Sequence, residues 1–124
     1  MSNIVRIDSS PRFSEAVIHN STIYLAGQVP TSDASLSNDA YIQTKSVLSE
    51  IDVYLKKAGS DKSKILSATV YLTTFDSYDG MNKAWVEWLP EGCAPARATI
   101  GNITLAKKDW LIEIQLTAAV TQSS

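Results

Sequence analysis

The longest regular hydrophobic pattern in the chain has helical spacing and begins at Ala40. Small or apolar residues recur there about every three or four positions and so share one face: Ala40, Thr44, Val47, Leu48, Ile51, Leu55 and Ala58. Gly59 follows as a typical helix stop, after two lysines whose charge complements the helix dipole. Residues 29–39 are rich in Pro, Ser, Asp and Asn, which predicts a loop that leads to a helix cap. We therefore predict an amphipathic helix from Ala40 onward.

Two further segments alternate between apolar and polar residues, which is the pattern of half-buried β-strands. Between positions 64 and 74, one face carries Leu66, Ala68, Val70 and Leu72, and the other carries Ser67, Thr69, Tyr71 and Thr73. Between positions 109 and 120, one face carries Trp110, Ile112, Ile114, Leu116 and Ala118, and the other carries Leu111, Glu113, Gln115, Thr117 and Ala119. Two shorter apolar runs flank the turn-forming pair Asn20 and Ser21 and predict a β-hairpin.

The remaining elements complete the pattern of an α+β fold. A second helix is predicted by the helical spacing of Tyr78, Met81, Trp85, Trp88 and Leu89. Residues 90–92 end this helix, and a further strand starts near Arg97. The order strands, helix, strand, helix, strands predicts one sheet with both helices on a single face. The opposite face would carry Tyr71, Glu113 and Gln115, which is too apolar for a solvated surface and too polar for a core. We expect that face to be an oligomer interface.

The size and composition of the chain fit one globular domain, residues 1–124. Of its 124 residues, 44% are hydrophobic and 19% are charged, so a core can form without disulfides. The formal net charge is −2 and no basic cluster exceeds two adjacent lysines, which argues against a nucleic-acid partner. Cys93 is the only cysteine, so no intrachain disulfide can form and a reducing compartment fits best. Without a membrane-length apolar run or a signal-peptide pattern, we expect a cytoplasmic protein with no membrane partner.

The residue types that several common chemistries need are missing from the chain. His19 is the only histidine, which leaves a nucleophilic triad with a single possible base. No cluster of cysteine and histidine has zinc spacing, and no array of carboxylates suggests a hard-metal site. Neither of the common glycine-rich phosphate-binding motifs is present. We therefore expect no metal and no nucleotide cofactor.

Arg97 and Glu113 are the residues best suited to carry chemistry. Both are predicted at strand positions, and Arg97 stands among small and apolar neighbours. One interpretation is a salt bridge between strands or subunits, although desolvation offsets most of the Coulomb energy of such a pair. The other is that Arg97 holds a carboxylate through two parallel hydrogen bonds while Glu113 handles a proton or a water. Asn82, in the second predicted helix, is either an exposed residue or a contributor to such a site.

Four segments of the chain share their residue types and their order with one protein family. They are IYLAGQVP (23–30), ILSATVYLTTFDSYDGMNKAWVEWL (65–89), APARATIG (94–101) and IEIQLTAAV (112–120). Together they resemble the RidA/YjgF (Rid) family of reactive imine and enamine deaminases. Residues 5–30 and the segment MNKAW (81–85) bring the chain especially close to the YoaB-like branch of that family.

The resemblance implies a chorismate-mutase-like fold and a homotrimer with clefts between neighbouring subunits. It also implies cofactor-independent hydrolysis of 2-imino and enamine acids, such as 2-aminoacrylate, to 2-oxo acids and ammonia. The carboxylate-binding arginine of the family falls on Arg97, its water-directing glutamate on Glu113 and its helix asparagine on Asn82. The backbone carbonyl of Thr99 is expected to accept a hydrogen bond from the imine nitrogen. Gly27, in the GQ pair of the first segment, is expected to line the substrate pocket.

Three positions depart from the pattern of the family's best-studied branch. Phe13 replaces a tyrosine, Ala26 replaces a serine, and Thr99 stands where cysteine is common. These changes remove two hydroxyls from the expected pocket and leave Arg97 and Glu113 in place. The alternative is a binding module that senses a 2-oxo acid or similar carboxylate without catalysis. A structural or ribonuclease role is disfavoured by the acidic balance of the chain.

Overall fold

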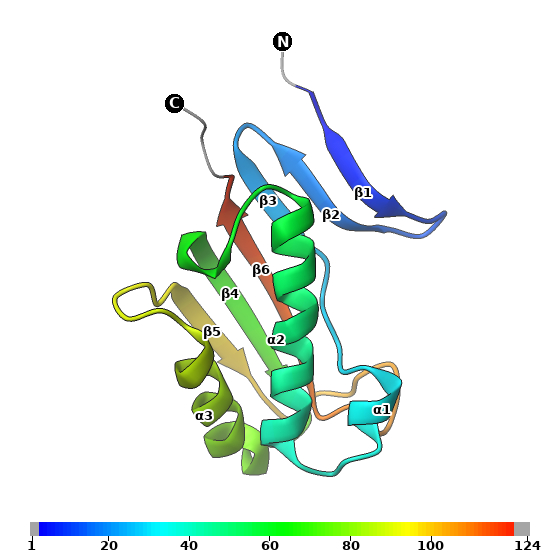
Figure 1. Ribbon diagram of the computed structural model, residues 1–124. Helices are drawn as coiled ribbons and strands as arrows, with labels where there is room; N and C mark the ends of the chain where they lie inside the picture. The colour runs from blue at the N-terminus through cyan, green and yellow to red at the C-terminus, as the bar shows by residue number, and fades with distance from the viewer. Residues whose placement is uncertain (1–2, 121–124) are drawn as a thin grey trace.

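One mixed sheet of six strands, in the order β1-β2-β3-β6-β4-β5, organises the computed structural model, which describes residues 3–120. The strands are β1 (Val5–Ser9), β2 (Ser14–His19), β3 (Thr22–Leu25), β4 (Ile65–Leu72), β5 (Ala96–Ile100) and β6 (Ile112–Ala119). Neighbouring strands are antiparallel, except that β4 and β5 run parallel. Helices α2 (Ala40–Lys57) and α3 (Tyr78–Trp88) pack against each other and cover the same face of the sheet (Figure 1). The predicted α+β architecture with both helices on a single face is confirmed.

The hairpin predicted around Asn20 and Ser21 is formed by β2 and β3. Both turn residues have positive φ angles, 52° and 66°, and the flanking residues His19 and Thr22 pair with each other. Strand β1, which the hydrophobic pattern does not single out, extends the sheet beyond β2 as a mostly exposed edge. An ion pair of 2.9 Å between Lys57 on α2 and Asp8 ties this edge strand to the helix layer.

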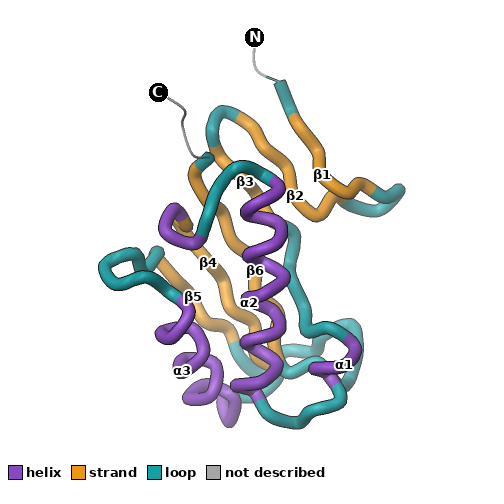
Figure 2. The backbone as a smooth tube through the Cα atoms, in the orientation of Figure 1, coloured by secondary structure: helices purple, strands orange, loops and turns teal. Residues whose placement is uncertain are grey.

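Helix α2 begins and ends where the sequence predicts. The Asp39 side chain caps its first turn by accepting hydrogen bonds from the backbone N–H groups of Tyr41 and Ile42. At its end, Gly59 has a φ of 83° and Ser60 N–H bonds to the Leu55 carbonyl at 2.8 Å, which forms a Schellman cap. Short helical turns at α1 (Ser32–Ser35), η1 (Lys62–Lys64) and η2 (Phe75–Ser77) fill the loops (Figure 2). Within residues 3–120, no helix has both the length and the apolar character needed to cross a membrane.

The core lies between the sheet and the two helices, and the alternation predicted for β6 is confirmed. Ile112, Ile114, Leu116 and Ala118 are fully buried, and the residues between them are half-buried on the open face. The prediction for β4 is wrong at Leu66, which is 51% exposed. A register shift between Ile65 and Ser67 turns Leu66 outward, and Ile65 takes its place in the core.

Gln43 is a buried polar residue on α2. Its side chain joins the loop that precedes α2 to the loop that precedes β6. Its Nε2 donates to the carbonyls of Ser37 at 2.8 Å and Asp109 at 2.9 Å, and its Oε1 accepts from Leu111 N–H at 2.8 Å. The Gln43 side chain is fully buried, so its own amide has no water to replace these backbone partners. Gln43 thereby fixes the segment that leads into β6.

Replacing Gln43 with Leu removes these three hydrogen bonds between α2 and the two loops. We expect the free energy of unfolding to fall by about 3 kcal/mol, since each lost hydrogen bond contributes about 1 kcal/mol. The matched control is Thr44→Val at the next buried position, where the hydroxyl bonds only to the Ala40 carbonyl of its own helix. Urea unfolding of both variants tests this role. A loss no larger in Gln43→Leu than in Thr44→Val would contradict it.

Candidate functional site

The pairing between β3 and β6 carries one irregularity, just beyond the end of β3. Tyr24 pairs with Thr117, whereas Gln28, four residues later, bridges Ile114, only three residues away on β6. Segment 25–28 absorbs the extra residue as a bulge. Two backbone hydrogen bonds of 2.8 and 3.0 Å hold Gln28 to Ile114, and the Gln115 side-chain amide donates to the Leu25 carbonyl at 3.1 Å. The bulge places Gly27 directly against Glu113.

Glu113 occupies the space where any other residue at position 27 would have its side chain. A Cβ added to Gly27 would stand 2.8 Å from Glu113 Cδ and closer still to Oε2. The Glu113 carboxylate forms no hydrogen bond or ion pair with any of residues 3–120, and burial raises the pKa of this carboxyl above its ordinary value. Such a carboxyl is suited to accept and return a proton.

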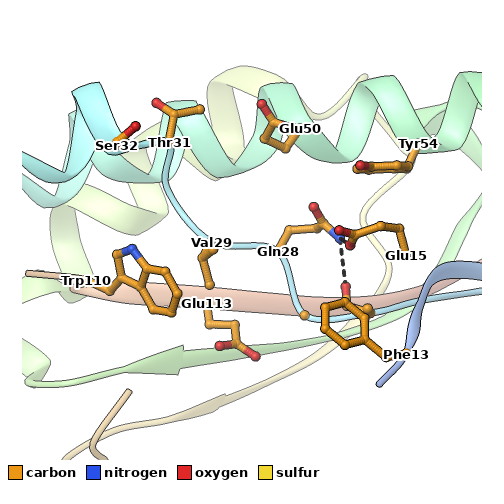
Figure 3. A pocket seen from close by; sticks show the side chains of 12 residues that line it. Phe13, Glu15, Gln28, Val29, Thr31, Ser32, Glu50, Tyr54, Trp110 and Glu113 are labelled. Atoms are coloured by element: carbon orange, nitrogen blue, oxygen red, sulfur yellow. Dashed lines mark hydrogen bonds between the residues drawn. The ribbon is translucent and has the colours of Figure 1, made fainter. Parts of the chain in front are cut away.

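A cleft of about 680 Å³ opens beside this bulge, between α2 and the tip of the β1–β2 hairpin (Figure 3). Its lining consists of Phe13, Glu15, Ala26, Gly27, Gln28, Val29, Thr31, Ser32, Glu50, Tyr54, Trp110 and Glu113. We call it the acidic cleft, because this lining includes three carboxylates and no basic side chain. The carboxylates do not form a metal site, since within residues 3–120 no three acidic, histidine or cysteine side chains are placed to hold an ion.

Electrostatics in the acidic cleft also affect Tyr54 on α2. Burial raises the pKa of the Tyr54 hydroxyl, and the negative charge of Glu15 raises it further. Gln28, only 5% exposed, also lines the cleft and donates from Nε2 to Glu15 Oε1 at 3.2 Å. A second hollow of about 440 Å³ on the open sheet face shares Gly27 and Glu113 with the acidic cleft. The Glu113 carboxylate therefore stands where two cavities meet.

Arg97 lies on the other face of the sheet. It pairs with Ala68, whose side chain is buried beneath the helices, whereas Glu113 pairs with Tyr71 on the open face. The Arg97 guanidinium lies over the Trp85 ring of α3, with Cζ 5.4 Å from the ring centroid, and Nη1 is 3.6 Å from Met81 Sδ. Among the described residues it has no acidic partner. An ion pair between Arg97 and Glu113 within one chain, which the sequence left open, is not formed.

The residues that the resemblance implicates thus fall into two groups within one chain. Phe13, Ala26, Gly27 and Glu113 line the acidic cleft. Arg97 and Thr99 share the helix-covered side of β5, because their partners on β4 are both buried, and half-buried Asn82 follows Met81 on α3. Neither Arg97, Thr99 nor Asn82 lines the acidic cleft.

Several lining residues of the acidic cleft were not singled out in the sequence. Trp110, assigned above to the core face, precedes β6 and lines the cleft instead. Glu50 lies one turn before Tyr54 at the edge of the apolar stripe of α2. That spacing in the sequence indicates that the two side chains share one side of the helix. Glu15 has no such signal, because only the packing of the hairpin against segment 26–32 brings it to the cleft.

The close approach of Gly27 to Glu113 makes Gly27→Ala a direct test of the site's geometry. The added methyl group must displace the carboxylate, so we expect the Glu113 pKa to move and the unfolding free energy to fall by about 1–3 kcal/mol. Carboxyl ¹³C titration by NMR measures the first effect, and urea unfolding measures the second. Gly80→Ala is the matched control, because its new methyl would contact Tyr41 and Ala40 and not Glu113. An unchanged Glu113 titration in Gly27→Ala would show that the carboxylate lies elsewhere.

The raised pKa of Glu113 also predicts how stability depends on pH. The folded state binds more protons than the unfolded state between the two pKa values, so stability decreases as pH rises through that window. Glu113→Gln is therefore expected to be more stable than the parent near pH 7, and the gain should vanish below the ordinary glutamate pKa of about 4.3. The exposed Glu91, changed to Gln, should show no such gain at either pH. Lower stability of Glu113→Gln near pH 7 would mean that the charge is stabilising.

The comparison with protein families relates this chain to known proteins. The family model described as Endoribonuclease L-PSP matches residues 3–120. A RutC family protein from Haemophilus ducreyi is 53% identical over 117 residues, which cover 94% of this chain and 97% of that protein. RutC family protein YoaB from Escherichia coli K12 is 44% identical over 117 residues, which cover 94% of this chain and 98% of YoaB.

The comparison with solved structures agrees with the sequence matches. The crystal structure of a YjgF family member from Neisseria meningitidis has a TM-score of 0.91 at 38% sequence identity, and the match covers 98% of each chain. A crystal structure titled as a putative translation initiation inhibitor, from Salmonella typhimurium, has a TM-score of 0.84 at 41% identity and covers 95% of this chain. With its sequence, fold and length all matched, the chain belongs to the RutC/YjgF family, also called the Rid family.

Proposed function

We propose that this chain hydrolyses reactive 2-imino and enamine acids of the 2-aminoacrylate type to 2-oxo acids and ammonia. The observation that carries the proposal is a pair of unpartnered charges, the Arg97 guanidinium and the Glu113 carboxylate. A guanidinium without an acidic partner can hold the carboxylate of a small acid through two parallel hydrogen bonds. A half-buried carboxylate with a raised pKa suits proton transfer to and from water. Membership of the Rid family supports the same activity.

The proposed site requires two copies of the chain, because the sheet separates Arg97 from Glu113 within one copy. Arg97, Thr99 and Asn82 of one copy would face Gly27 and Glu113 of the next. The open sheet face supports such contact, since it exposes Tyr24 by 46% and Ile100 by 42%. A head-to-tail contact that closes into a ring gives every copy an equivalent site. Because the family resemblance implies three copies in this ring, we infer a homotrimer with its sites between subunits.

In the proposed reaction the substrate is a protonated imine with an adjacent carboxylate. Arg97 holds the carboxylate, and the Thr99 carbonyl accepts a hydrogen bond from the imine nitrogen. Water adds to the imine carbon while Glu113 takes one of its protons, which gives a carbinolamine. Glu113 returns that proton to the nitrogen and then accepts the hydroxyl proton as the carbon–nitrogen bond breaks, so that ammonia leaves and the 2-oxo acid forms. Transfer of this last proton from Glu113 to the released ammonia or to water restores the carboxylate. The protonated imine is already electrophilic, so acid–base help of about 10²–10⁴-fold, together with positioning, is sufficient.

RNA fits the acidic cleft less well, although the matched family carries an endoribonuclease description. Three carboxylates and no basic side chain line the cleft, so a phosphodiester would be repelled there. A membrane partner is not part of the proposal either. We propose a cytoplasmic location, because the single cysteine, Cys93, cannot form an intrachain disulfide.

The decisive experiment removes the carboxylate anchor. With imine generated by an amino-acid oxidase and followed by semicarbazide trapping, Arg97→Ala should lose at least about a hundredfold in kcat/KM, as expected for a charged, bidentate contact. Arg6→Ala removes the same charge from the exposed edge strand β1 and should retain parental turnover. Parental turnover in Arg97→Ala would refute the role. Binding of a 2-oxo acid by the parent protein without any imine hydrolysis would instead establish the non-catalytic binding module.

A mixing experiment tests whether each site spans two copies. Arg97→Ala and Glu113→Gln should each be inactive, yet a refolded equal mixture should regain about one quarter of the parental activity. Random assembly of a ring places an intact Arg97 opposite an intact Glu113 at about one interface in four. Mixing each variant with itself is the control. If both catalytic groups came from one chain, every site in the mixture would remain defective and no activity would return.

A further inference from the structure

The row of residues that would hold the substrate continues beyond Arg97 and Thr99. Both lie on the helix-covered side of β5, and the alternation of a strand places Gly101, just past the end of β5, next in that row. Successive residues on one side of a strand are about 6–7 Å apart. A substrate with its carboxylate at Arg97 and its nitrogen at Thr99 therefore has the region of Gly101 within reach of its side chain.

Phe75, in η2, occupies that region. A Cβ added to Gly101 would stand 2.5 Å from Phe75 Cδ2 and 2.8 Å from Cζ, and closer still to Cε2. The phenyl ring thus lies directly on the backbone at the end of β5, where only glycine leaves room for it. Phe75 is nevertheless 50% exposed, so part of its ring remains free to contact a ligand.

Tyr78, the first residue of α3, enlarges this apolar surface. Its ring is tilted by 60° against the Phe75 ring, with the two centroids 6.0 Å apart, and the residue is 39% exposed. Tyr78 lies one turn before Asn82 on α3, so the two side chains share one side of the helix. We call Phe75 and Tyr78 the aromatic pair. Exposed apolar groups gathered beside a proposed site are typical of a contact with a ligand or a partner.

Two contacts fix the position of the aromatic pair relative to Arg97. The Arg97 guanidinium lies over the Trp85 ring, with Cζ 5.4 Å from the centroid, and Phe75 lies on Gly101. The segment from η2 through α3 therefore runs along β5, with its later part at Arg97 and its start at Gly101 (Figure 1). The guanidinium and the aromatic pair thus stand at opposite ends of the row, and Thr99 lies between them.

The charges near the aromatic pair do not decide which side chain it receives. Asp76 and Asp79 are neighbours of the pair in the sequence, but both are exposed, so water and salt screen their effect on a bound charge. The main favourable contribution is then the burial of apolar surface against two rings. Contacts between aromatic rings add to that burial through their preferred tilted or offset geometry. A flat, apolar side chain therefore fits the pair best.

We propose that Phe75 and Tyr78 determine substrate specificity, and that the site prefers 2-imino acids with an aromatic side chain. This inference rests on the proposed function, because it takes Arg97 and Thr99 as the groups that hold the carboxylate and the imine nitrogen. The substrate ring packs on the aromatic pair, and the imine carbon stays beside Thr99, where Glu113 of the next copy activates the water. The methyl side chain of the smallest imino acids does not extend to the pair.

An aromatic pair beside a subunit boundary can also serve as a contact between copies. The two uses differ in their dependence on the substrate side chain. Loss of a contact between copies would weaken assembly and change the hydrolysis of all imino acids alike. Loss of a contact with the substrate would change only the substrates with a large side chain. The ratio of kcat/KM between a large and a small substrate therefore separates the two uses.

Binding is measured first, so that the test does not depend on turnover. Calorimetry of the full-length protein compares phenylpyruvate with pyruvate, two stable 2-oxo acids that differ by a phenyl ring. We expect phenylpyruvate to bind at least about tenfold tighter, and Phe75→Ala to remove most of this preference. Tyr78→Phe keeps the ring and should retain the preference. Leu36→Ala, the matched control, removes an apolar side chain that is 84% exposed at the end of α1 and should leave the preference unchanged.

Turnover is then compared with imines generated in place from phenylalanine and from alanine by an amino-acid oxidase. Phe75→Ala should lower the phenylalanine-to-alanine ratio of kcat/KM about tenfold, and Tyr78→Ala should lower it in the same direction. Sedimentation of each variant measures its assembly. Tyr78→Ala also keeps the inference testable if Phe75→Ala does not fold.

The outcomes separate this inference from the proposed function. Equal binding of the two analogues, or a preference that survives both Phe75→Ala and Tyr78→Ala, overturns the inference. An equal loss of turnover for both imines together with weaker assembly also overturns it, because the pair is then a contact between copies. Hydrolysis of neither imine, with a binding preference that Phe75→Ala removes, overturns the deaminase function and leaves the ligand class standing. Hydrolysis of both imines without preference overturns the inference and leaves the function standing.

Discussion

The close approach of Gly27 to Glu113 is the contact on which the site depends. A regular β3–β6 ladder would have continued pairing past Tyr24, but the bridge from Gln28 to Ile114 leaves one residue in excess. The extra residue bends segment 25–28 toward β6, and a hydrogen bond from the Gln115 side-chain amide to the Leu25 carbonyl holds that bend. A carboxylate then fills the place of a missing side chain, unpaired and partly desolvated. β-Bulges commonly redirect side chains beside functional sites. This bulge brings the Gly27 backbone against Glu113, the candidate base.

The geometry of a pleated sheet explains why Arg97 and Glu113 lie apart within one copy. Side chains alternate between the two faces, and the partners of Arg97 and Glu113 on β4, Ala68 and Tyr71, are three residues apart. An odd separation places the two charges on opposite faces, whatever the rotamers. Trp85 supports the guanidinium through its ring and leaves the hydrogen-bonding edges without an acid. A single copy therefore keeps the two charges apart, and the proposed site needs a neighbouring copy to bring them together.

The fold was largely predictable because its local patterns agree with its packing. The stripe on α2, the caps at Asp39 and Gly59, and the alternation in β6 are local signals, and the structure follows them. The prediction for Leu66 was wrong because a bulge shifts the alternation of β4 by one residue, and the hydrophobic pattern alone does not reveal a bulge. Gln43 was missed because its role depends on backbone partners in two loops, one of them more than 60 residues away, and not on its own polarity.

The residues of the candidate site stand out in the sequence by their type, but their arrangement does not. Arg97 and Glu113 are conspicuous as charges within apolar strands, and the family resemblance places Gly27 in the pocket. That these residues lie on two faces follows only from the register of β4 with its two neighbours. Glu15 and Glu50 are ordinary carboxylates in the sequence, and they become part of a cleft only when the β2 hairpin and α2 converge on segment 26–32. Such long-range convergence is not visible in a local pattern.

The distribution of charge also bears on how a product would leave. A protonated imino acid carries a negative and a positive group next to each other, so in the proposed site between copies it would meet Arg97 of one copy and Glu113 of the next. Hydrolysis converts the positive imine into a neutral ketone, and the attraction of Glu113 for that end of the molecule is lost. The carboxylate of the product still meets Arg97, but it now stands near acids whose repulsion is no longer offset. In the proposed reaction, the same unpaired charges that would bind the reactant would therefore hold the product less tightly.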